Sequence, residues 1–523
     1  MRRTLRSPRA GLLLVLALAL VVRLLLFFHG VRGSDAYVYA RHAALLASGE
    51  YSPFRLGADW YGYRYTIIVP TALAYRLFGV GDWPSAMFPL LFGLGSILVV
   101  FRLARLIFDA ETALWSALVF ATLPLSIACS TGLGADSFIP FFSGLAVLAL
   151  LEAERTERLG RRAAWLALMG LAFYACVSAR LVAVVLLLFF VGYGFLRRCP
   201  RPFLGSVLLA LGLPLALEGA VFLMVTGDPL TQWHEVAPAL TSLTSVSVTS
   251  LAYYPRAMVG LDLGGLATYG FFFYLAAGGA VVGLISAPRA AAVPLLWLVP
   301  VLGFLEFGSI SPTRYVPIHK SYNYLSLVTV PAALLAGYCL SAIARSWPAG
   351  RGRAAAGAVA ACVVLTSLYG AYRILGNSEA DSRPYVVVYA TLTQSPARPI
   401  YVHHFRWKLV LDYFFRYRRS DIRMVWDRPA PTQARDAYLV VHDRYLYWTT
   451  AGRPIVRAPG RPASTQEGEV LPEYLFAPPP TWALLDDFSD RFGHVRLFWI
   501  PDGRAAAGSV SAGAGRLPGF RRD

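Results

Sequence analysis

The segment GLLLVLALALVVRLLLFFH, residues 11–29, places a long apolar run close to the start of the chain. A helix of this length crosses a hydrocarbon core of about 30 Å. No small-residue cleavage pattern of the A-x-A type follows it before Asp35. The run is therefore predicted to be a retained first transmembrane helix rather than a signal peptide. Its start is expected in the cytoplasm because four arginines precede it: Arg2, Arg3, Arg6 and Arg9.

Similar apolar runs recur through the first 375 residues. The chain is 57% hydrophobic and 15% charged, whereas soluble proteins carry about 25% charged residues. We therefore expect an all-α polytopic membrane bundle of about eleven transmembrane helices. After the first, their approximate ranges are 83–107, 110–128, 136–152, 162–178, 181–196, 203–225, 265–286, 291–308, 322–344 and 354–372.

The loops that this threading places in the cytoplasm are short and basic, as the positive-inside rule requires. Segment 66–79 is apolar but short and contains Pro70. It is predicted to be a helix lying at the membrane interface, because a crossing there would put every later basic loop outside. The basic loops hold Arg102 and Arg105, then Arg155, Arg158, Arg161 and Arg162, then Arg197, Arg198 and Arg201, then Arg289, and finally Arg345, Arg351 and Arg353.

The sequence predicts a transmembrane domain over 1–374, with outside loops at 30–82, 226–264 and 309–321. After it the apolar runs stop and strand-like pieces appear: RPIYVHHF, DIRMVWD and DAYLVVHD, with the helical run WKLVLDYFFRYRR between the first two. This pattern predicts a small extracytoplasmic α/β domain over 375–502. The Gly/Ala/Ser/Arg-rich tail, 503–523, is expected to be flexible.

Two carboxylates on the predicted outer side are candidates for chemistry. Asp35 follows the first helix, and Asp136 stands at the outer mouth of the fourth span. A carboxylate there can accept the proton of an incoming hydroxyl, with the second acid lining the same cavity. The alternative is that each residue, or Ser34 in place of Asp35, caps a helix N-terminus by accepting backbone N–H bonds.

Several cations also fall on the predicted outer side, where the positive-inside rule does not explain them. As a group they suit an anionic head group on a lipid tail, although each alone also fits a surface residue. They are Arg64, Arg180, Arg314, His319 and Lys320.

Other polar side chains lie within the predicted spans. Arg23 is inside the first helix and is expected to face a polar interior or to snorkel to the interface. Glu218 and Glu306 are expected to pair with arginines of the bundle. Tyr39 belongs to an aromatic-rich first loop, and Tyr322 to the run TRYVPIHKSYNYL that enters the tenth span. Such rings stack on sugars, but they also form the interfacial belt of any membrane protein.

The sequence lacks a P-loop, a dinucleotide fingerprint and an H-E-x-x-H site. The formal charge of +18 is carried largely by topology-setting arginines, so no nucleic-acid partner is expected. The five cysteines have no metal-ligand spacing. No compact acidic cluster appears, so no metal or other cofactor is expected, and a sugar donor, if used, is expected to be lipid-linked.

The chain resembles the membrane glycosyltransferases of the C-type fold (GT-C), near the protein-mannosyltransferase and aminoarabinose-transferase branch. The likeness covers residues 11–345. It is carried by Arg23 with SDAYVYARHAALLASGEY, by YRYTIIVPTALAYRLFGVGDW, by residues 103–150 and by TRYVPIHKSYNYLSLVTVPAALLAGYCL. Many relatives carry two adjacent acids in the first outside loop, whereas Ala36 follows Asp35 here.

The resemblance implies a multi-pass enzyme of the inner or plasma membrane that moves a sugar from a polyprenyl-phosphate donor to a lipid, glycan or protein acceptor. It implies that Asp35 activates the acceptor hydroxyl, with inversion, and that Asp136 supports the same cavity. Arg180 and Lys320 would then bind the donor phosphate, with Arg64 and His319 beside them. Two other hypotheses remain: a lipid or glycan flippase, and a non-catalytic membrane scaffold.

Overall fold

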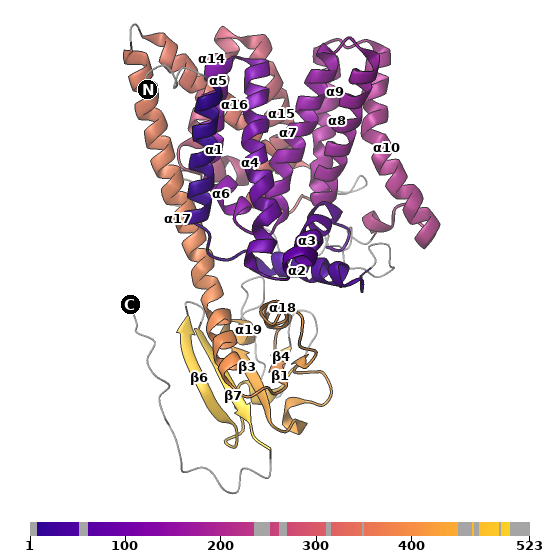
Figure 1. Ribbon diagram of the computed structural model, residues 1–523, viewed down its shortest axis with the longest axis vertical. Coiled ribbons are helices and arrows are strands. Elements are labelled where there is room, and N and C mark those ends of the chain that lie inside the picture. Colours follow the sequence, from indigo (N-terminus) through magenta and orange to yellow (C-terminus); the bar gives the residue numbers. More distant parts are fainter. Residues whose placement is uncertain are drawn as a thin grey trace. The chain divides into compact units, whose positions relative to one another are not determined.

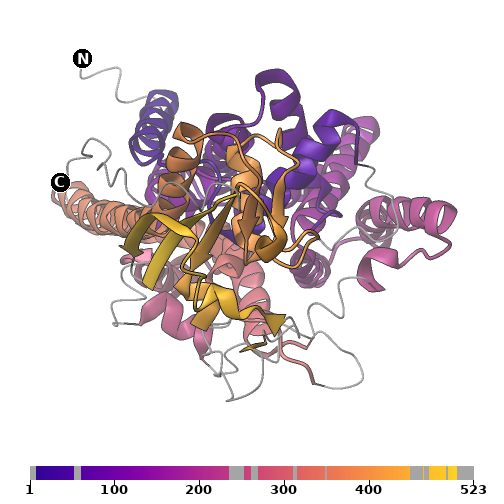
Figure 2. The same cartoon turned by 90° about the horizontal axis from the view of Figure 1, so that it is seen from below.

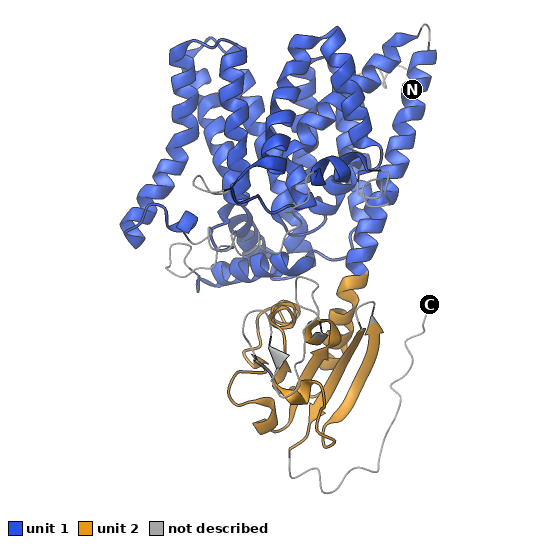
Figure 3. Cartoon of the chain, turned by 180° about the vertical axis from the view of Figure 1, so that it is seen from behind, with its two compact units in different colours: residues 1–379 blue, residues 380–523 orange. Residues whose placement is uncertain are grey.

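The computed structural model describes residues 8–51, 61–234, 252–260, 269–309, 315–347, 350–447, 463–464, 470–490 and 493–502. The chain forms two compact units, Met1–Glu379 and Ala380–Asp523 (Figure 3). The division falls inside one long helix, α17 (Arg351–Gln394), whereas the sequence places it between residues 374 and 375. Arg314 and the tail 503–523, both singled out in the sequence, lie outside the described residues.

The first unit is a helical bundle, which confirms the predicted all-α polytopic architecture (Figure 1). Eight of its described helices are long and apolar enough to cross a membrane, or nine if the bent pair α5 (Ala110–Thr122) and α6 (Pro124–Ser130) counts as one span. The eight include α17 and also α1 (Pro8–Leu25), α4 (Asp82–Ile107), α7 (Phe138–Arg155), α8 (Leu159–Ala179), α10 (Arg201–Thr226), α15 (Pro288–Phe307) and α16 (Ser326–Ser346).

Two of the eleven predicted spans are shorter in the structure. Residues Leu181–Leu196 form the 3₁₀ segment η3 (Leu181–Leu186) followed by α9 (Leu187–Leu196). Helix α14 covers Phe272–Ser286. Both are apolar and lie where spans were expected, but they fall below the length that a full crossing needs.

Helix α16 forms the core of the bundle, and nearly all of its residues are buried. It packs tightly against α5 and α14 because glycines remove side chains at the contacts. A Cβ at Gly337 would collide with Ser116 of α5, and a Cβ at Gly279 of α14 would collide with the backbone of Leu335. Small residues commonly allow such close approach between helices in membranes, where water does not drive association.

Helices α2 (Gly33–Ser48) and α3 (Tyr65–Phe78) lie together at one end of the bundle, and α2 runs crosswise to the long helices (Figure 1). Helix α3 occupies the segment predicted to lie at the interface and is too short to count as a full span. Its N-terminus follows directly on the Tyr61–Arg64 turn. The pair therefore brings polar side chains of the segment between α1 and α4 to one end of the bundle.

Arg23 holds α1 against the break between α5 and α6. The two helices are bent by 60° at Pro124, which has no N–H for a continuous helix. Arg23 is 1% exposed and donates from Nη1 to the carbonyl of Ala121 at 3.0 Å, near the end of α5. It also donates to the hydroxyls of Ser126 at 2.9 Å and Ser130 at 2.7 Å. The snorkelling interpretation is therefore wrong, because the guanidinium points into the bundle.

The second unit contains a five-stranded sheet of order β2-β1-β3-β7-β6 (orange and yellow in Figure 2). The predicted strand pieces form β1 (Ile400–Val402), β2 (Ile422–Met424) and β3 (Ala437–His442), which pair in parallel, and α18 (Phe405–Phe414) connects the first two. Sequence reasoning missed the antiparallel hairpin of β6 (Ala483–Asp490) and β7 (Gly493–Ile500). This hairpin extends the sheet beyond β3, with which β7 pairs. Two-residue strands β4 (Ala463–Ser464) and β5 (Val470–Leu471) pair separately.

Histidines gather at the carboxyl ends of β1 and β3. His403 follows β1, and its Nδ1 lies 3.1 Å from the carbonyl of Val440. Burial lowers the pKa of His403 to about 4 and the pKa of His442 to about 3. Both are 2% exposed, so the fold holds both rings neutral at neutral pH.

We expect Arg23→Met to lower the free energy of unfolding of the bundle by about 2–3 kcal/mol, because a carbonyl and two hydroxyls lose their donor. Arg23→Lys should lower the free energy of unfolding by a smaller amount, because an ammonium keeps the charge but lacks the planar fork of donors. Thermal unfolding in detergent measures both effects. Arg41→Met, at an exposed position of α2, is the control, and an equal shift there would contradict the assignment.

The second unit should lose stability on acidification. A histidine whose folded pKa lies below its unfolded value of about 6.5 stabilises the fold above that pH, and the contribution is lost as pH falls toward the folded pKa. The protection of amides in residues 400–446 against hydrogen exchange, corrected for the intrinsic pH dependence of the exchange rate, should therefore fall between pH 7 and pH 4. His442→Phe should flatten this dependence, whereas the exposed His494→Gln should not. An unchanged pH profile in His442→Phe would contradict the prediction.

Candidate active site

Asp35 lies in the first turn of α2 without capping it. The residue at the N-cap is Arg32, and no side chain makes a capping hydrogen bond there. Asp35 instead accepts hydrogen bonds at Oδ1 from the hydroxyls of Tyr61, at 2.8 Å, and Ser34, at 3.4 Å. The capping interpretation is therefore wrong for both Ser34 and Asp35. Among the described residues no donor binds Oδ2 of this exposed carboxylate, so that oxygen can accept a hydrogen bond or a proton from a ligand.

Arg64 stands at the N-cap of α3, next to the Tyr61 ring whose hydroxyl binds Asp35. Its Nη1 donates to the hydroxyl of Tyr39 in a close contact. Its Cζ lies 5.5 Å from the centre of the Tyr39 ring and 5.3 Å from that of Tyr61, within the range of cation–π attraction. Burial raises the pKa of Tyr39 to about 12, against the effect of Arg64. Tyr39 therefore stays a neutral phenol that orients the guanidinium.

Asp136 and Arg180 form a buried ion pair. Arg180 stands at the C-cap of α8, and its Nη2 lies 3.0 Å from Asp136 Oδ2, with 14% and 9% of the two side chains exposed. Asp136 belongs to the 3₁₀ turn η2 (Ala135–Ser137), whose N-cap is Gly134 without a side-chain bond, so the capping interpretation is wrong here too. The Arg180 Cζ also lies 5.1 Å from the centre of the Tyr324 ring.

His319 joins these two groups. Burial lowers its pKa, the charge of Arg180 lowers it further, and the charge of Asp35 opposes them. Tyr39 likewise responds to the charges of Arg64, Asp35, Arg180 and Asp136. Such couplings require short distances. The structure therefore brings together six residues singled out from the sequence: Asp35, Tyr39, Arg64, Asp136, Arg180 and His319.

Lys320, next in the chain, has different partners. Its Nζ lies 2.6 Å from Oε1 of Glu306, and both side chains are nearly fully buried. Glu306 also accepts from the backbone N–H groups of Tyr253, at 3.1 Å, and Tyr254, at 2.9 Å, which begin α12 (Tyr253–Val259). This arrangement joins α12, α15 and the segment that carries His319. Glu306 thus pairs with a lysine and not with an arginine as predicted.

Glu218 lies on α10 and accepts from the hydroxyl of Tyr174 at 2.9 Å. No arginine pairs with it among the described residues, so the predicted arginine partner is wrong here as well. Tyr322 opens the 3₁₀ segment η4 (Tyr322–Leu325), and its carbonyl accepts from Tyr269 at 3.2 Å.

Sequence reasoning overlooked Arg32, although it lies between α1 and α4, as Arg64 does. Its Nη2 donates to the carbonyl of Ala128 at 2.8 Å and to the hydroxyl of Thr131 at 3.0 Å. Sequence reasoning also overlooked Tyr61 as a partner of Asp35, because the aromatic rings of the loop after the first helix were equally expected at the membrane interface. The sequence offers only one signal for Arg32 and Tyr61, which is a suitable residue type close to Asp35. Only the contacts in the structure distinguish these two residues from others of the same type nearby.

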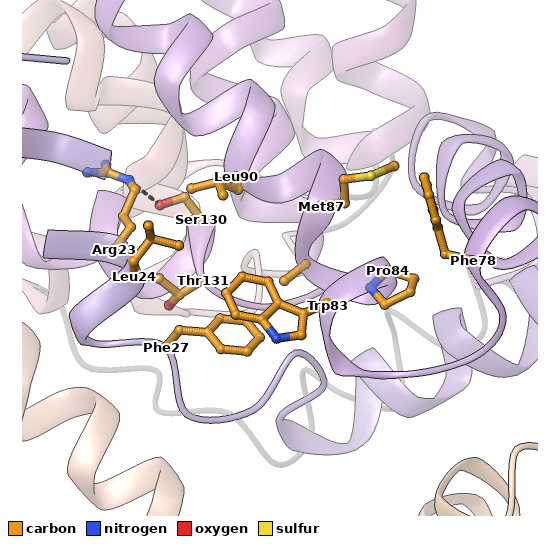
Figure 4. Close-up of a pocket in the computed structure, with 11 residues that line it drawn as sticks. Arg23, Leu24, Phe27, Phe78, Trp83, Pro84, Met87, Leu90, Ser130 and Thr131 are labelled. Carbon is orange, nitrogen blue, oxygen red and sulfur yellow. Dashed lines mark hydrogen bonds between the residues drawn. The ribbon is translucent and has the colours of Figure 1, made fainter. Parts of the chain in front are cut away.

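An apolar cavity of about 450 Å³ lies between α1, α4 and the end of α3 (Figure 4). The rings of Phe27 and Trp83 stack at 4.2 Å in its wall, and Phe78 and Met87 line it farther along. Arg23 borders the cavity while its guanidinium is held by Ser130. No group of three His, Cys, Asp or Glu residues in the described parts of the chain is placed to hold a metal ion.

Comparisons with known proteins point to a membrane protein family and to solved structures with the same fold. The family described as dolichyl-phosphate-mannose-protein mannosyltransferase matches residues 70–221. No curated protein matches the sequence. The crystal structure of ArnT from Cupriavidus metallidurans in the apo state superposes with a TM-score of 0.60 at 17% identity, over 93% of this chain and 97% of that chain.

Two further solved structures are similar. ArnT from the same organism bound to undecaprenyl phosphate gives a TM-score of 0.59 at 17% identity, with the same coverage of 93% and 97%. The apo oligosaccharyltransferase of Archaeoglobus fulgidus gives 0.50 at 13% identity, over 81% of this chain and 65% of that chain. These likenesses confirm the predicted fold, which the chain shares with these membrane proteins.

Replacing one partner of the buried pair should lower the free energy of unfolding more than replacing both partners together. We expect Asp136→Asn or Arg180→Met alone to destabilise the bundle by about 3–5 kcal/mol, because one charge is left buried without its partner. The double variant should lose less than the sum of the two. Thermal unfolding of the four proteins measures the coupling. The exposed pair Arg345–Asp109, at 2.7 Å, serves as control and should couple by about 1 kcal/mol or less; equal coupling in both pairs would refute the prediction.

Proposed function

We propose that the chain is a glycosyltransferase that moves a sugar from a polyprenyl-phosphate carrier to an acceptor hydroxyl, at the end of the bundle where α2 and α3 lie. The observation that carries this proposal is the convergence of an open carboxylate, Asp35, with the cations Arg64 and Arg180 and the neutral His319. The fold shared with ArnT, one structure of which holds undecaprenyl phosphate, supports it.

Asp35 is the proposed base. Oδ2 accepts the proton of the acceptor hydroxyl as the hydroxyl oxygen attacks the anomeric carbon from the face opposite the phosphate. The new glycosidic C–O bond forms while the bond from that carbon to the phosphate oxygen breaks, and the phosphate leaves with the electron pair. This single displacement inverts the anomeric carbon. Tyr61 holds Oδ1, which fixes the direction in which Oδ2 faces.

Arg180 and Arg64 stabilise the negative charge that develops on the leaving phosphate. Each is held in place before the donor binds: Arg180 by Asp136 and the Tyr324 ring, and Arg64 by Tyr39. Pre-orientation of this kind avoids reorganising the site during the reaction. His319, neutral at pH 7, adds a hydrogen-bonding group. Lys320 anchors the segment that carries His319, because its charge is already paired with Glu306.

The carrier tail and the acceptor occupy different surroundings in this proposal. The apolar cavity beside Phe78 and Trp83 (Figure 4) suits the isoprenoid tail, with α3 as one wall. The reaction faces the extracytoplasmic side, with the N-terminus in the cytoplasm, following the distribution of the arginines. The acceptor is a lipid, a glycan or a protein hydroxyl, and the second unit is proposed to help bind it outside the membrane.

Replacing the base should abolish transfer without unfolding the protein. In detergent extracts supplied with radiolabelled polyprenyl-phosphate sugars, Asp35→Asn should lower the rate of transfer by about 10²–10⁴-fold, the usual contribution of a general base. Its thermal stability should change little, since Asp35 is exposed. Glu50→Gln, at an exposed acid just after α2, is the matched control.

Equal transfer by wild type and Asp35→Asn would remove Asp35 as the base. No transfer by the wild type from any donor in the panel would overturn the glycosyltransferase proposal. Movement of a fluorescent lipid-linked sugar between leaflets would then distinguish a flippase from a scaffold.

A further inference from the structure

A second cavity, of about 360 Å³, lies beside Asp136. Arg32, Asp136 and Tyr322 supply polar groups to its wall, and Leu133 and Ile374 supply apolar ones. Ligand pockets span about 300–1,000 Å³, so this cavity has room for a single ring and not for an oligosaccharide chain. It is distinct from the apolar cavity around Trp83, which shares none of these residues.

The Arg32 side chain is fixed in the wall of this cavity. Its Nη2 donates to Ala128 and Thr131, and the bond from the Leu133 N–H to the Gly30 carbonyl, 2.7 Å, ties its backbone to the same turn. The guanidinium lies against Gly132. A Cβ at that position would approach Arg32 Nη2 to 2.6 Å, so a side chain there would displace the arginine.

Two buried atoms of these residues have no hydrogen-bond partner among the described residues: Arg32 Nη1, a donor, and Asp136 Oδ1, an acceptor. Asp136 is 7% exposed, and its other oxygen is bound to Arg180. Buried polar groups of native proteins normally find partners. Both residues line this cavity, so a ligand that accepts and donates hydrogen bonds would supply the two missing partners.

We propose that this cavity binds the sugar ring of the donor and selects a polyhydroxylated ring without a positive charge. The inference rests on the proposed glycosyl transfer and adds its substrate class. A hydroxyl both accepts and donates, so sugar hydroxyls bind Arg32 Nη1 and Asp136 Oδ1 together. Tyr322 offers its ring to the apolar face of the sugar.

The charges of the cavity disfavour a cationic ring. Arg32 and Asp136 both line it, and the charge of Asp136 is already balanced by Arg180. An amino sugar would bring its ammonium close to the guanidinium of Arg32 in a poorly hydrated space, which is unfavourable.

The position of the cavity suits the reaction. Arg32 immediately precedes α2, which carries Asp35 in its first turn. Asp136 and Asp35 both act electrostatically on Tyr39. A ring bound between Arg32 and Asp136 therefore lies next to the proposed base and to Arg180, the proposed ligand of the phosphate.

The test uses the purified full-length protein in lipid nanodiscs. The donors are undecaprenyl-phosphate-linked sugars: a neutral hexose, its deoxy analogues and an amino sugar. The variants are Arg32→Gln and Gly132→Ala, which displaces Arg32 without removing a polar group. Arg41→Gln, an exposed arginine on α2, is the control. Competition by bare undecaprenyl phosphate measures recognition of the carrier without a sugar.

Wild type should prefer the neutral hexose over the amino sugar. Arg32→Gln and Gly132→Ala should each raise the KM for the hexose donor by about 10–100-fold, the loss expected for hydrogen bonds to a charged group. One deoxy analogue should show this loss already with the wild type and little further loss in the variants. Competition by bare undecaprenyl phosphate should be unchanged in every variant.

Weaker competition by bare undecaprenyl phosphate in Arg32→Gln would make Arg32 a phosphate ligand and overturn the sugar-site proposal. An unchanged KM in both variants, or a preference of the wild type for the amino sugar, would overturn it as well. In each of these cases transfer still occurs, so the proposed function survives. Absence of transfer and of donor binding by the wild type would instead overturn both.

Discussion

The ion pair between Asp136 and Arg180 is the interaction on which the site depends. A charge inside an apolar bundle is costly unless a partner and hydrogen bonds compensate it. Asp136 begins the segment that enters α7, and Arg180 ends α8, so their contact sets the relative position of two helix ends. His319, Tyr324 and the Arg32 cavity are arranged around this pair.

The two carboxylates of the site have different surroundings, and this difference separates their roles. Asp136 is buried and bound to a cation. Asp35 is exposed and held through one oxygen by Tyr61. A carboxylate committed to an arginine is a poorer base than one with an open oxygen. The fold thereby leaves one acid available for proton transfer and uses the other to position a cation.

The same requirement to pair buried charges explains the supports around the site. Arg23 binds the carbonyl at the broken end of α5, and the pair of Lys320 and Glu306 anchors α12 and the segment before α16 to α15. Neither arrangement offers a free charge to a substrate. In the second unit burial keeps His403 and His442 neutral, which ties the stability of that unit to pH.

The sequence by itself determined the bundle and its candidate residues. Apolar runs and outside cations are local signals, because crossing a bilayer requires about 20 consecutive apolar residues. Asp35, Arg64, Asp136, Arg180 and His319 were all recognisable in this way, as were strands β1, β2 and β3. The fold resemblance also followed from the order of these pieces.

Only the tertiary structure decided which of these residues act together. Whether Asp35 caps a helix or meets Tyr61, and whether Lys320 faces a substrate or Glu306, depends on contacts between segments distant in the chain. The importance of Arg32 depends on Gly132, a hundred positions away. Pairing of buried polar groups is a property of three-dimensional neighbourhoods, and no local pattern in the sequence encodes it.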